Sequence, residues 1–97
     1  MRKLDWSEDA LAEFRRAIAY IANDDPVAAR SVRQRINDTA LLLQNHPIGR
    51  QGRVTGTYEK SVTRTPYIIS YALSDEAVTI LRVIHTSRNW RAEEWPE

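Results

Sequence analysis

The dipeptide Asp25–Pro26 constrains the fold more than any other feature, because it ends one amphipathic helix and begins another. Proline at the first position of a helix gives up only a backbone N–H that has no helical partner there, and the aspartate before it can cap the new helix. Apolar residues recur three or four positions apart on both sides of this dipeptide, as they do along one face of a helix. The sequence therefore predicts an antiparallel helical hairpin with a link of two residues, Asp24 and Asp25.

Capping and stop signals set the limits of the two helices. Ser7 can accept a hydrogen bond from a backbone N–H of the first turn, and the pattern that follows it ends near Asn23. The second helix begins at Pro26 and is stopped by Pro47 and Gly49. The apolar residues that we expect in the core are Leu11, Phe14, Ile18 and Ile21 in the first helix and Ala29, Val32, Ile36, Ala40 and Leu43 in the second.

Residues typical of β-strands fill the second half of the chain. β-Branched and aromatic residues concentrate in three segments that turn-forming residues separate, and a fourth short segment precedes the first helix. The predicted strands are residues 2–6, 58–62, 67–73 and 78–85. The order β-α-α-β-β-β predicts an α+β fold, in which a helical hairpin packs on one face of an antiparallel sheet. Two helices cover only one face, so we expect a partner on the other.

The last predicted strand contains an arginine among apolar residues. Arg82 alternates with Ile80 and Ile84. Because side chains two positions apart point to the same face of a strand, we expect these three side chains on one face of the sheet.

The length and composition exclude several classes of protein. Ninety-seven residues predict a single domain over residues 1–97. The absence of cysteine excludes disulfides, thiolate metal sites and thiol nucleophiles, and we expect neither a metal nor a cofactor. No apolar segment approaches the roughly 20 residues that span a bilayer, and the acidic amino terminus does not resemble a signal peptide. We therefore expect a cytoplasmic protein without membrane contact.

The net charge of +1 hides an uneven distribution. Residues 50–91 carry seven basic side chains against three acidic ones, and three further glutamates lie within residues 93–97. Of the 14 basic residues 12 are arginines, whose planar guanidinium suits paired hydrogen bonds to carboxylate or phosphate. An anionic partner and an ordinary arginine-rich surface are both compatible with this composition.

Four stretches of the sequence resemble the ParE branch of the ParE/RelE superfamily of toxins. They are YIANDDPVAA at residues 20–29, GRQGRVTGTYE at 49–59, TPYIISY at 65–71 and VTILRVIHTSRNW at 78–90. The resemblance implies a small bacterial toxin with the RelE/ParE-like fold. It also implies a cognate antitoxin from the same operon, whose carboxy-terminal segment wraps the toxin and would cover the open face of the sheet.

The resemblance leaves two modes of action open. ParE-like members are associated with poisoning DNA gyrase, whereas RelE-like and YoeB-like members cut messenger RNA on the ribosome. RNA cleavage needs a cation to stabilise the phosphorane, and RelE-like toxins carry an arginine where this sequence has Ile68. We therefore expect a toxin that inhibits gyrase by binding, without sequence-specific DNA binding of its own. A ribosome-dependent endoribonuclease is the alternative.

The candidate site residues lie in the second half of the chain. For target binding we expect Arg82, His85, Arg88 and Trp90, and for antitoxin binding Arg53, Tyr58, Arg64 and Arg82. If the chain is a nuclease, His85 would act as acid or base, with Arg64 or Arg88 stabilising charge. For a gyrase inhibitor the question of catalytic residues does not arise.

Several of these residues also have a structural interpretation. His85 can support the fold or contact the antitoxin, and Arg82 can be a partly buried structural arginine. Trp90 can pack against the edge of the sheet, whereas Trp95 is better suited to a contact outside the domain. The glycines near Arg53 can cradle a phosphate, but a strand and not a helix follows them, so we favour a tightly turning loop.

Overall fold

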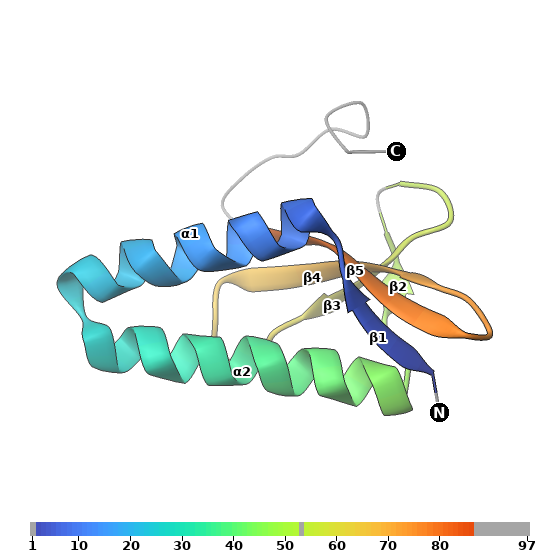
Figure 1. The fold of residues 1–97 in the computed structure, drawn as a ribbon, viewed down its shortest axis with the longest axis horizontal. Helices are drawn as coiled ribbons and strands as arrows, with labels where there is room; N and C mark the ends of the chain where they lie inside the picture. Colours follow the sequence, from blue (N-terminus) through green and yellow to red (C-terminus); the bar gives the residue numbers. More distant parts are fainter. Residues whose placement is uncertain (1, 53, 87–97) are drawn as a thin grey trace.

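The computed structural model describes residues 2–52 and 54–86. In chain order they form β1 (Lys3–Trp6), α1 (Glu8–Asp24), α2 (Pro26–Asn45), β2 (Arg50–Gln51), β3 (Tyr58–Ser61), β4 (Tyr67–Leu73) and β5 (Ala77–His85). Within these residues the strands form one five-stranded sheet, and both helices lie on the same side of it (Figure 1). The predicted α+β fold with a helical hairpin on one face of the sheet is confirmed.

The strand order across the sheet is β1-β5-β4-β3-β2. From β2 to β5 each strand pairs antiparallel with the next, as predicted, but β1 pairs parallel with β5, from Lys3 opposite Ala77 to Trp6 opposite Ile80. A parallel pair needs a crossover connection, which the helical hairpin supplies at the start of the path from β1 to β5. The sheet is therefore mostly antiparallel, and β2 adds a two-residue strand within the segment predicted as a loop.

The helical hairpin forms at the predicted residues. Ser7 Oγ accepts a hydrogen bond from Ala10 N, and Asp25 Oδ1 accepts one from Ala28 N, both at 3.0 Å. Asp25 also ends α1, because its backbone N–H donates to Ile21 O at 2.9 Å. One residue thus caps both helices, so α2 must turn back directly along α1.

The core lies between the helices and the sheet. α2 buries the predicted residues Ala29, Ile36, Ala40 and Leu43. From β4 and β5 the core takes Tyr67, Ile69, Tyr71, Val78, Ile80 and Val83, and it also takes Val62, which directly follows β3. At the start of α1, the rings of Trp6 and Phe14 stack with centroids 5.4 Å apart, which anchors the helix over β1.

A β-bulge changes which residues of β5 face the helices. Tyr71 of β4 pairs with Ile80, but the preceding Ser70 pairs with Arg82, so β5 has one extra residue at this point. Such an insertion reverses the alternation of a strand. Ile80 faces the helical core, whereas Arg82 and Ile84 lie on the opposite face. The prediction that these three share a face is wrong, because alternation along a sequence does not reveal a bulge.

The face of the sheet turned away from the helices is buried at its centre. Ile68, Ser70 and Ile84 lie on this face, and their exposed fractions are 6%, 0% and 1%. An uncovered face would leave these side chains accessible to solvent. The centre of this face is therefore buried rather than open, and the expectation that a partner binds this face stays a prediction.

Tyr71 joins the sheet to the segment that follows α2. Its buried hydroxyl donates a hydrogen bond to Ile48 O at 2.9 Å. Gly49 lies against the same hydroxyl, and a Cβ there would come within 2.9 Å of Tyr71 Oη and 2.7 Å of Glu59 O. Burial raises the pKa of Tyr71, and the nearby Tyr58 phenol adds to the rise.

We predict that Tyr71 makes the fold sensitive to alkaline pH. The unfolded chain ionises this phenol at about pH 10, below the raised pKa of the folded state, so the stability that Tyr71 contributes is complete below about pH 10 and is lost as pH rises through the folded pKa. Tyr71→Phe should lower the free energy of unfolding at pH 8 by about 1 kcal/mol, through the lost hydrogen bond, and flatten the alkaline decline.

Urea unfolding between pH 8 and 11 measures both effects. Tyr20→Phe is the matched control, because Tyr20 is 74% exposed. Identical alkaline declines for the unsubstituted chain and Tyr71→Phe would contradict the prediction.

Candidate functional site

Beyond the end of β1, Ser7 and α1 take over the hydrogen bonds to the backbone of β5. Ser7 donates its backbone N–H to Ile80 O at 2.8 Å and its hydroxyl to Leu81 O at 2.9 Å. Further along α1, Glu13 Oε1 accepts the N–H of Val83 at 3.1 Å. Groups at the start of α1 therefore satisfy backbone donors and acceptors of β5 that a neighbouring strand would otherwise bind.

The same carboxylate binds Arg82. Arg82 Nε lies 2.9 Å from both oxygens of Glu13, and Arg82 Nη2 lies 2.7 Å from Oε2. The exposed fractions of the two side chains are only 8% and 10%. Of the two interpretations of Arg82 that the sequence leaves open, the structural one fits this geometry. Arg82 attaches α1 to β5, and its expected role in target and antitoxin binding stays a prediction.

A row of polar residues crosses the face of the sheet that is turned away from the helices. Register places Glu59 of β3 opposite Ser70 of β4, and Ser70 opposite Arg82 of β5. All three are buried, and Arg50 Nη2 lies 3.6 Å from Glu59 Oε1. The Ser70 hydroxyl is buried without a hydrogen-bond partner in the part of the chain that the structure describes. Sequence reasoning missed this row, because it depends on cross-strand register.

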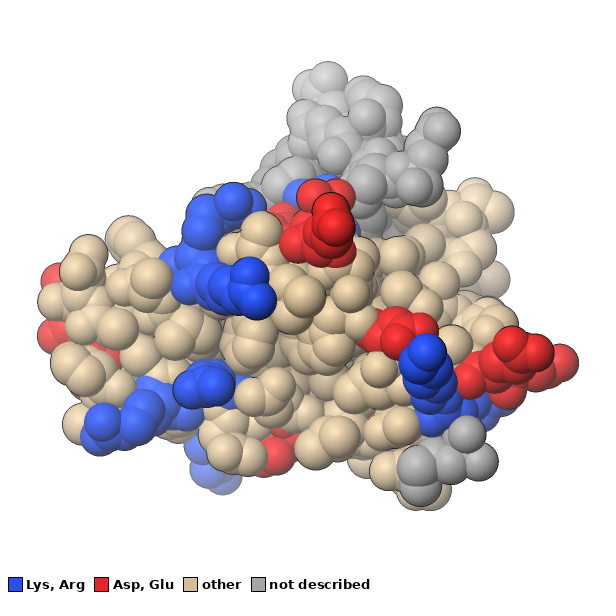
Figure 2. Space-filling view, in the orientation of Figure 1, with Lys and Arg blue, Asp and Glu red and all other residues tan. Residues whose placement is uncertain are grey.

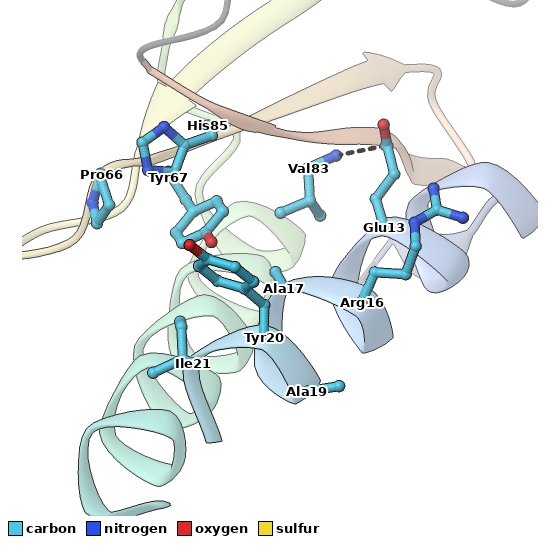
Figure 3. Close-up of a pocket in the computed structure, with 10 residues that line it drawn as sticks. All are labelled: Glu13, Arg16, Ala17, Ala19, Tyr20, Ile21, Pro66, Tyr67, Val83 and His85. Atoms are coloured by element: carbon cyan, nitrogen blue, oxygen red, sulfur yellow. Dashed lines mark hydrogen bonds between the residues drawn. The ribbon is translucent and has the colours of Figure 1, made fainter. Parts of the chain in front are cut away.

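A groove of about 710 Å³ opens between α1 and the ends of β4 and β5 (Figure 3). Arg16 and Tyr20 of α1 line one side, and Tyr67 and His85 of the sheet line the other. Tyr67 and His85 are cross-strand partners whose rings meet edge to face, with centroids 5.2 Å apart. Glu13 closes one end, where its carboxylate accepts the Val83 N–H.

The groove has the composition of a binding surface. Tyrosine and arginine are the residue types that most often dominate protein interfaces, and here Tyr20 and Arg16 are both exposed. Among residues 2–52 and 54–86, no group of three or more His, Asp or Glu side chains could hold a metal ion. Within the same residues no helix is long and apolar enough to cross a membrane.

The structure does not gather the predicted site residues into one cluster. His85 lines the groove, and Arg64 is exposed in the turn between β3 and β4, at the same end of the sheet. Tyr58 lies at the other end of β3, where its ring stacks on Tyr71 with centroids 5.6 Å apart. Arg53, Arg88, Trp90 and Trp95 lie outside the described residues.

Sequence reasoning missed the residues that α1 contributes to the site. Glu13, Arg16 and Tyr20 lie on the polar side of an amphipathic helix, and the sequence does not reveal what that side borders. The only available signal was the position of Glu13 next to the apolar residue Phe14. A carboxylate at the border between the apolar and polar sides of a helix is more often buried and paired than one in the middle of the polar side.

Comparison with known proteins agrees with this architecture. The family model described as the ParE toxin of the type II toxin-antitoxin system, parDE, matches residues 4–90. The chain is 38% identical over 90 residues to the Sinorhizobium fredii protein named "Putative toxin Y4kP", covering 92% of this chain and 93% of that protein. It is 33% identical over 89 residues to Toxin RelE2 of Caulobacter vibrioides, covering 91% and 99%.

Among solved structures, the fold matches a chain of the chromosomal ParDE toxin-antitoxin system from P. aeruginosa. The TM-score is 0.81 at 22% sequence identity, and the match covers 88% of this chain and 96% of that chain.

We predict that Glu13 is worth more to stability than its place on a helix surface suggests. Glu13→Ala should lower the free energy of unfolding by about 3 kcal/mol, because it removes the carboxylate from the buried Arg82 and from the Val83 N–H. Glu13→Leu combined with Arg82→Met should recover about half of this loss, since no buried charge is then left without its partner.

Urea unfolding of the single and double variants measures these values. The control is Lys3→Ala, which breaks the exposed Lys3–Asp5 pair at 3.9 Å and should cost less than about 1 kcal/mol. A Glu13→Ala variant as stable as Lys3→Ala would show that the edge of β5 does not depend on this carboxylate.

Proposed function

The chain belongs to the ParE toxin family of type II toxin-antitoxin systems, and from this membership we propose that it inhibits DNA gyrase by binding rather than by chemistry. The observation that carries the proposal is Ile68. RelE-like nucleases resemble this chain but carry an arginine there, whereas Ile68 is apolar and 6% exposed. A buried aliphatic side chain does not stabilise the charge of a phosphorane.

The groove is the proposed contact with gyrase. Tyr20 offers an exposed ring, Arg16 an exposed guanidinium, and His85 and Tyr67 a wall of two packed rings. Aromatic and arginine anchors of this kind contribute most of the binding energy of typical interfaces. Arg88 and Trp90 follow His85 along the chain and remain part of the proposed contact. Gyrase and its DNA lie in the cytoplasm, so the toxin acts there.

The proposed antitoxin contact runs along β3. Tyr58 begins β3 and Arg64 lies in the turn beyond its other end, so a segment that touches both must follow the whole length of this strand. An extended carboxy-terminal segment of the antitoxin meets that requirement better than a compact domain. Arg53 lies on the chain between β2 and β3 and belongs to the same proposed contact.

We predict that the purified chain inhibits supercoiling of relaxed plasmid by gyrase at micromolar concentration. Tyr20→Ala should raise the concentration for half-inhibition about tenfold, because it removes one exposed aromatic anchor without changing the core. Lys3→Ala, far from the groove, should leave inhibition unchanged. No inhibition and no trapped cleavage complex at micromolar toxin would contradict the proposal.

One observation favours the alternative, a ribosome-dependent endoribonuclease. An imidazole (His85), a phenol (Tyr67) and a guanidinium (Arg16) line the same groove, and these groups can move protons and stabilise charge. Arg64, exposed in the neighbouring turn, is a further candidate for the cation.

The two functions make different predictions for His85→Gln after induction in cells. A nuclease produces new messenger ends in phase with codons, which primer extension maps, and His85→Gln should abolish both the ends and the growth arrest. The gyrase proposal predicts no such ends. Codon-phased ends that disappear in His85→Gln would replace the gyrase proposal with the nuclease.

A further inference from the structure

A second surface lies along the seam between the two helices, on the outer side of the hairpin. Arg15 of α1 and Arg30 and Arg33 of α2 are exposed there. At 100° per residue, Arg15 is turned away from Arg16 and the groove, towards the side of α1 that borders α2. We call Arg15, Arg30 and Arg33 the seam arginines.

Arg30 and Arg33 occupy the matching flank of α2. They share it with Gln44, whose Nε2 donates to Arg2 O at 2.8 Å where β1 runs from the end of α2 towards α1. Figure 2 views the outer side of the hairpin and shows Lys and Arg side chains over both helices. Arg30 and Arg33 are about 5 Å apart along the axis, and packed helices lie 8–10 Å apart, so the seam arginines span roughly 10 Å.

The seam arginines have no acidic partner within the residues that the structure describes. Their side chains take part in none of the ion pairs or hydrogen bonds of the fold. Asp38, the carboxylate of α2, accepts a hydrogen bond from Gln34 Nε2 at 2.8 Å. The first-turn acids of α1, Glu8 and Asp9, lie about 9 Å or more along the axis from Arg15. The three guanidiniums are therefore unpaired, although the exposed carboxylates of Asp25 and Asp38 lie five residues from Arg30 and Arg33 along the chain.

The chemistry of this surface fits the backbone of a nucleic-acid duplex. Duplex DNA carries one negative charge per about 1.7 Å of its axis, so a surface roughly 10 Å wide meets several phosphates. Small side chains, Ala12 and Ser31, lie near the seam arginines on the outer side of the helices. They let a rigid duplex approach the guanidiniums closely.

A partner protein helix or an unpaired strand fits this surface less well. A docked helix needs a continuous apolar stripe, but the exposed apolar residues here, Val27 and Leu41, lie about 21 Å apart along α2. An unpaired strand needs aromatic rings on which to stack its bases. Tyr20, the most exposed ring among the described residues, lies on the groove flank of α1 instead.

We propose that the seam arginines bind the phosphate backbone of duplex DNA without preference for sequence. Arg15 lies about 100° around α1 from Arg16, and Arg30 and Arg33 belong to α2, so we infer that a partner protein in the groove leaves the seam accessible. We further infer that the seam holds the DNA next to gyrase. This last step rests on the proposed function, whereas the DNA contact itself does not.

The test measures binding of a fluorescent 20-base-pair DNA duplex to the chain free of antitoxin, by anisotropy between 50 and 200 mM salt. We expect a dissociation constant of about 10⁻⁴ to 10⁻⁶ M at physiological salt. Three phosphate contacts predict a slope of log K against log salt of about −2.7, and Arg30→Gln with Arg33→Gln should reduce it to about −0.9.

The control pair, Lys3→Gln with Arg35→Gln, removes the same net charge away from the seam and should keep the slope near −2.7. Circular dichroism confirms that both double variants are folded. Equal slopes for the two double variants would overturn the proposal. Tighter binding to an RNA duplex of the same sequence would overturn the choice of DNA.

The gyrase assay separates this inference from the proposed function. If both hold, the seam variant should require more toxin for half-inhibition than the control pair does. A chain that binds DNA through the seam but never inhibits gyrase would overturn the proposed function and support the seam. A chain whose inhibition and DNA binding both survive loss of the seam arginines would overturn the seam alone.

Discussion

The rest of the structure depends on how the edge of β5 is closed beyond the end of β1. β1 has only four residues, whereas β5 has nine. The part of β5 beyond the end of β1 would therefore have no backbone hydrogen-bond partners on that side. Ser7 caps α1 and binds Leu81 O with one hydroxyl, and Glu13 accepts the Val83 N–H and the Arg82 guanidinium. These contacts hold α1 against the sheet, and through the shared cap at Asp25 they also direct α2.

The position of α1 creates two surfaces with different chemistry. Arg15 and Arg16 are neighbours in sequence but lie 100° apart around the helix, so one belongs to the seam and the other to the groove. The groove presents aromatic rings, which we propose as the contact with a protein partner, and the seam presents unpaired guanidiniums, which we propose as the contact with phosphates. An inhibitor of an enzyme that works on DNA would have a use for both, because the two partners are found together.

The buried polar groups belong to the framework that presents these surfaces. Arg82 was an attractive candidate for partner binding because it is an arginine in a strand of a basic half. In the structure Glu13 binds the Arg82 guanidinium and both side chains are buried, so this pair is costly to break. Neighbouring Ser70 and Glu59 show that polarity on this face of the sheet does not by itself mark an exposed site.

The sequence by itself determined the local structure and the family. Helical periodicity, the caps at Ser7 and Asp25 and the strand-forming segments of the second half depend on residues close together in the chain, and four motifs identified the toxin family. Only the tertiary structure decided the parallel pairing of β1, the bulge before Arg82 and the groove beside Tyr20. The bulge depends on the register of β4 against β5, and the other two depend on segments about 70 residues apart in the chain. The periodicity of a sequence predicts which side chains share a face of a regular helix or strand, but it reveals neither a bulge nor the segment that packs against that face.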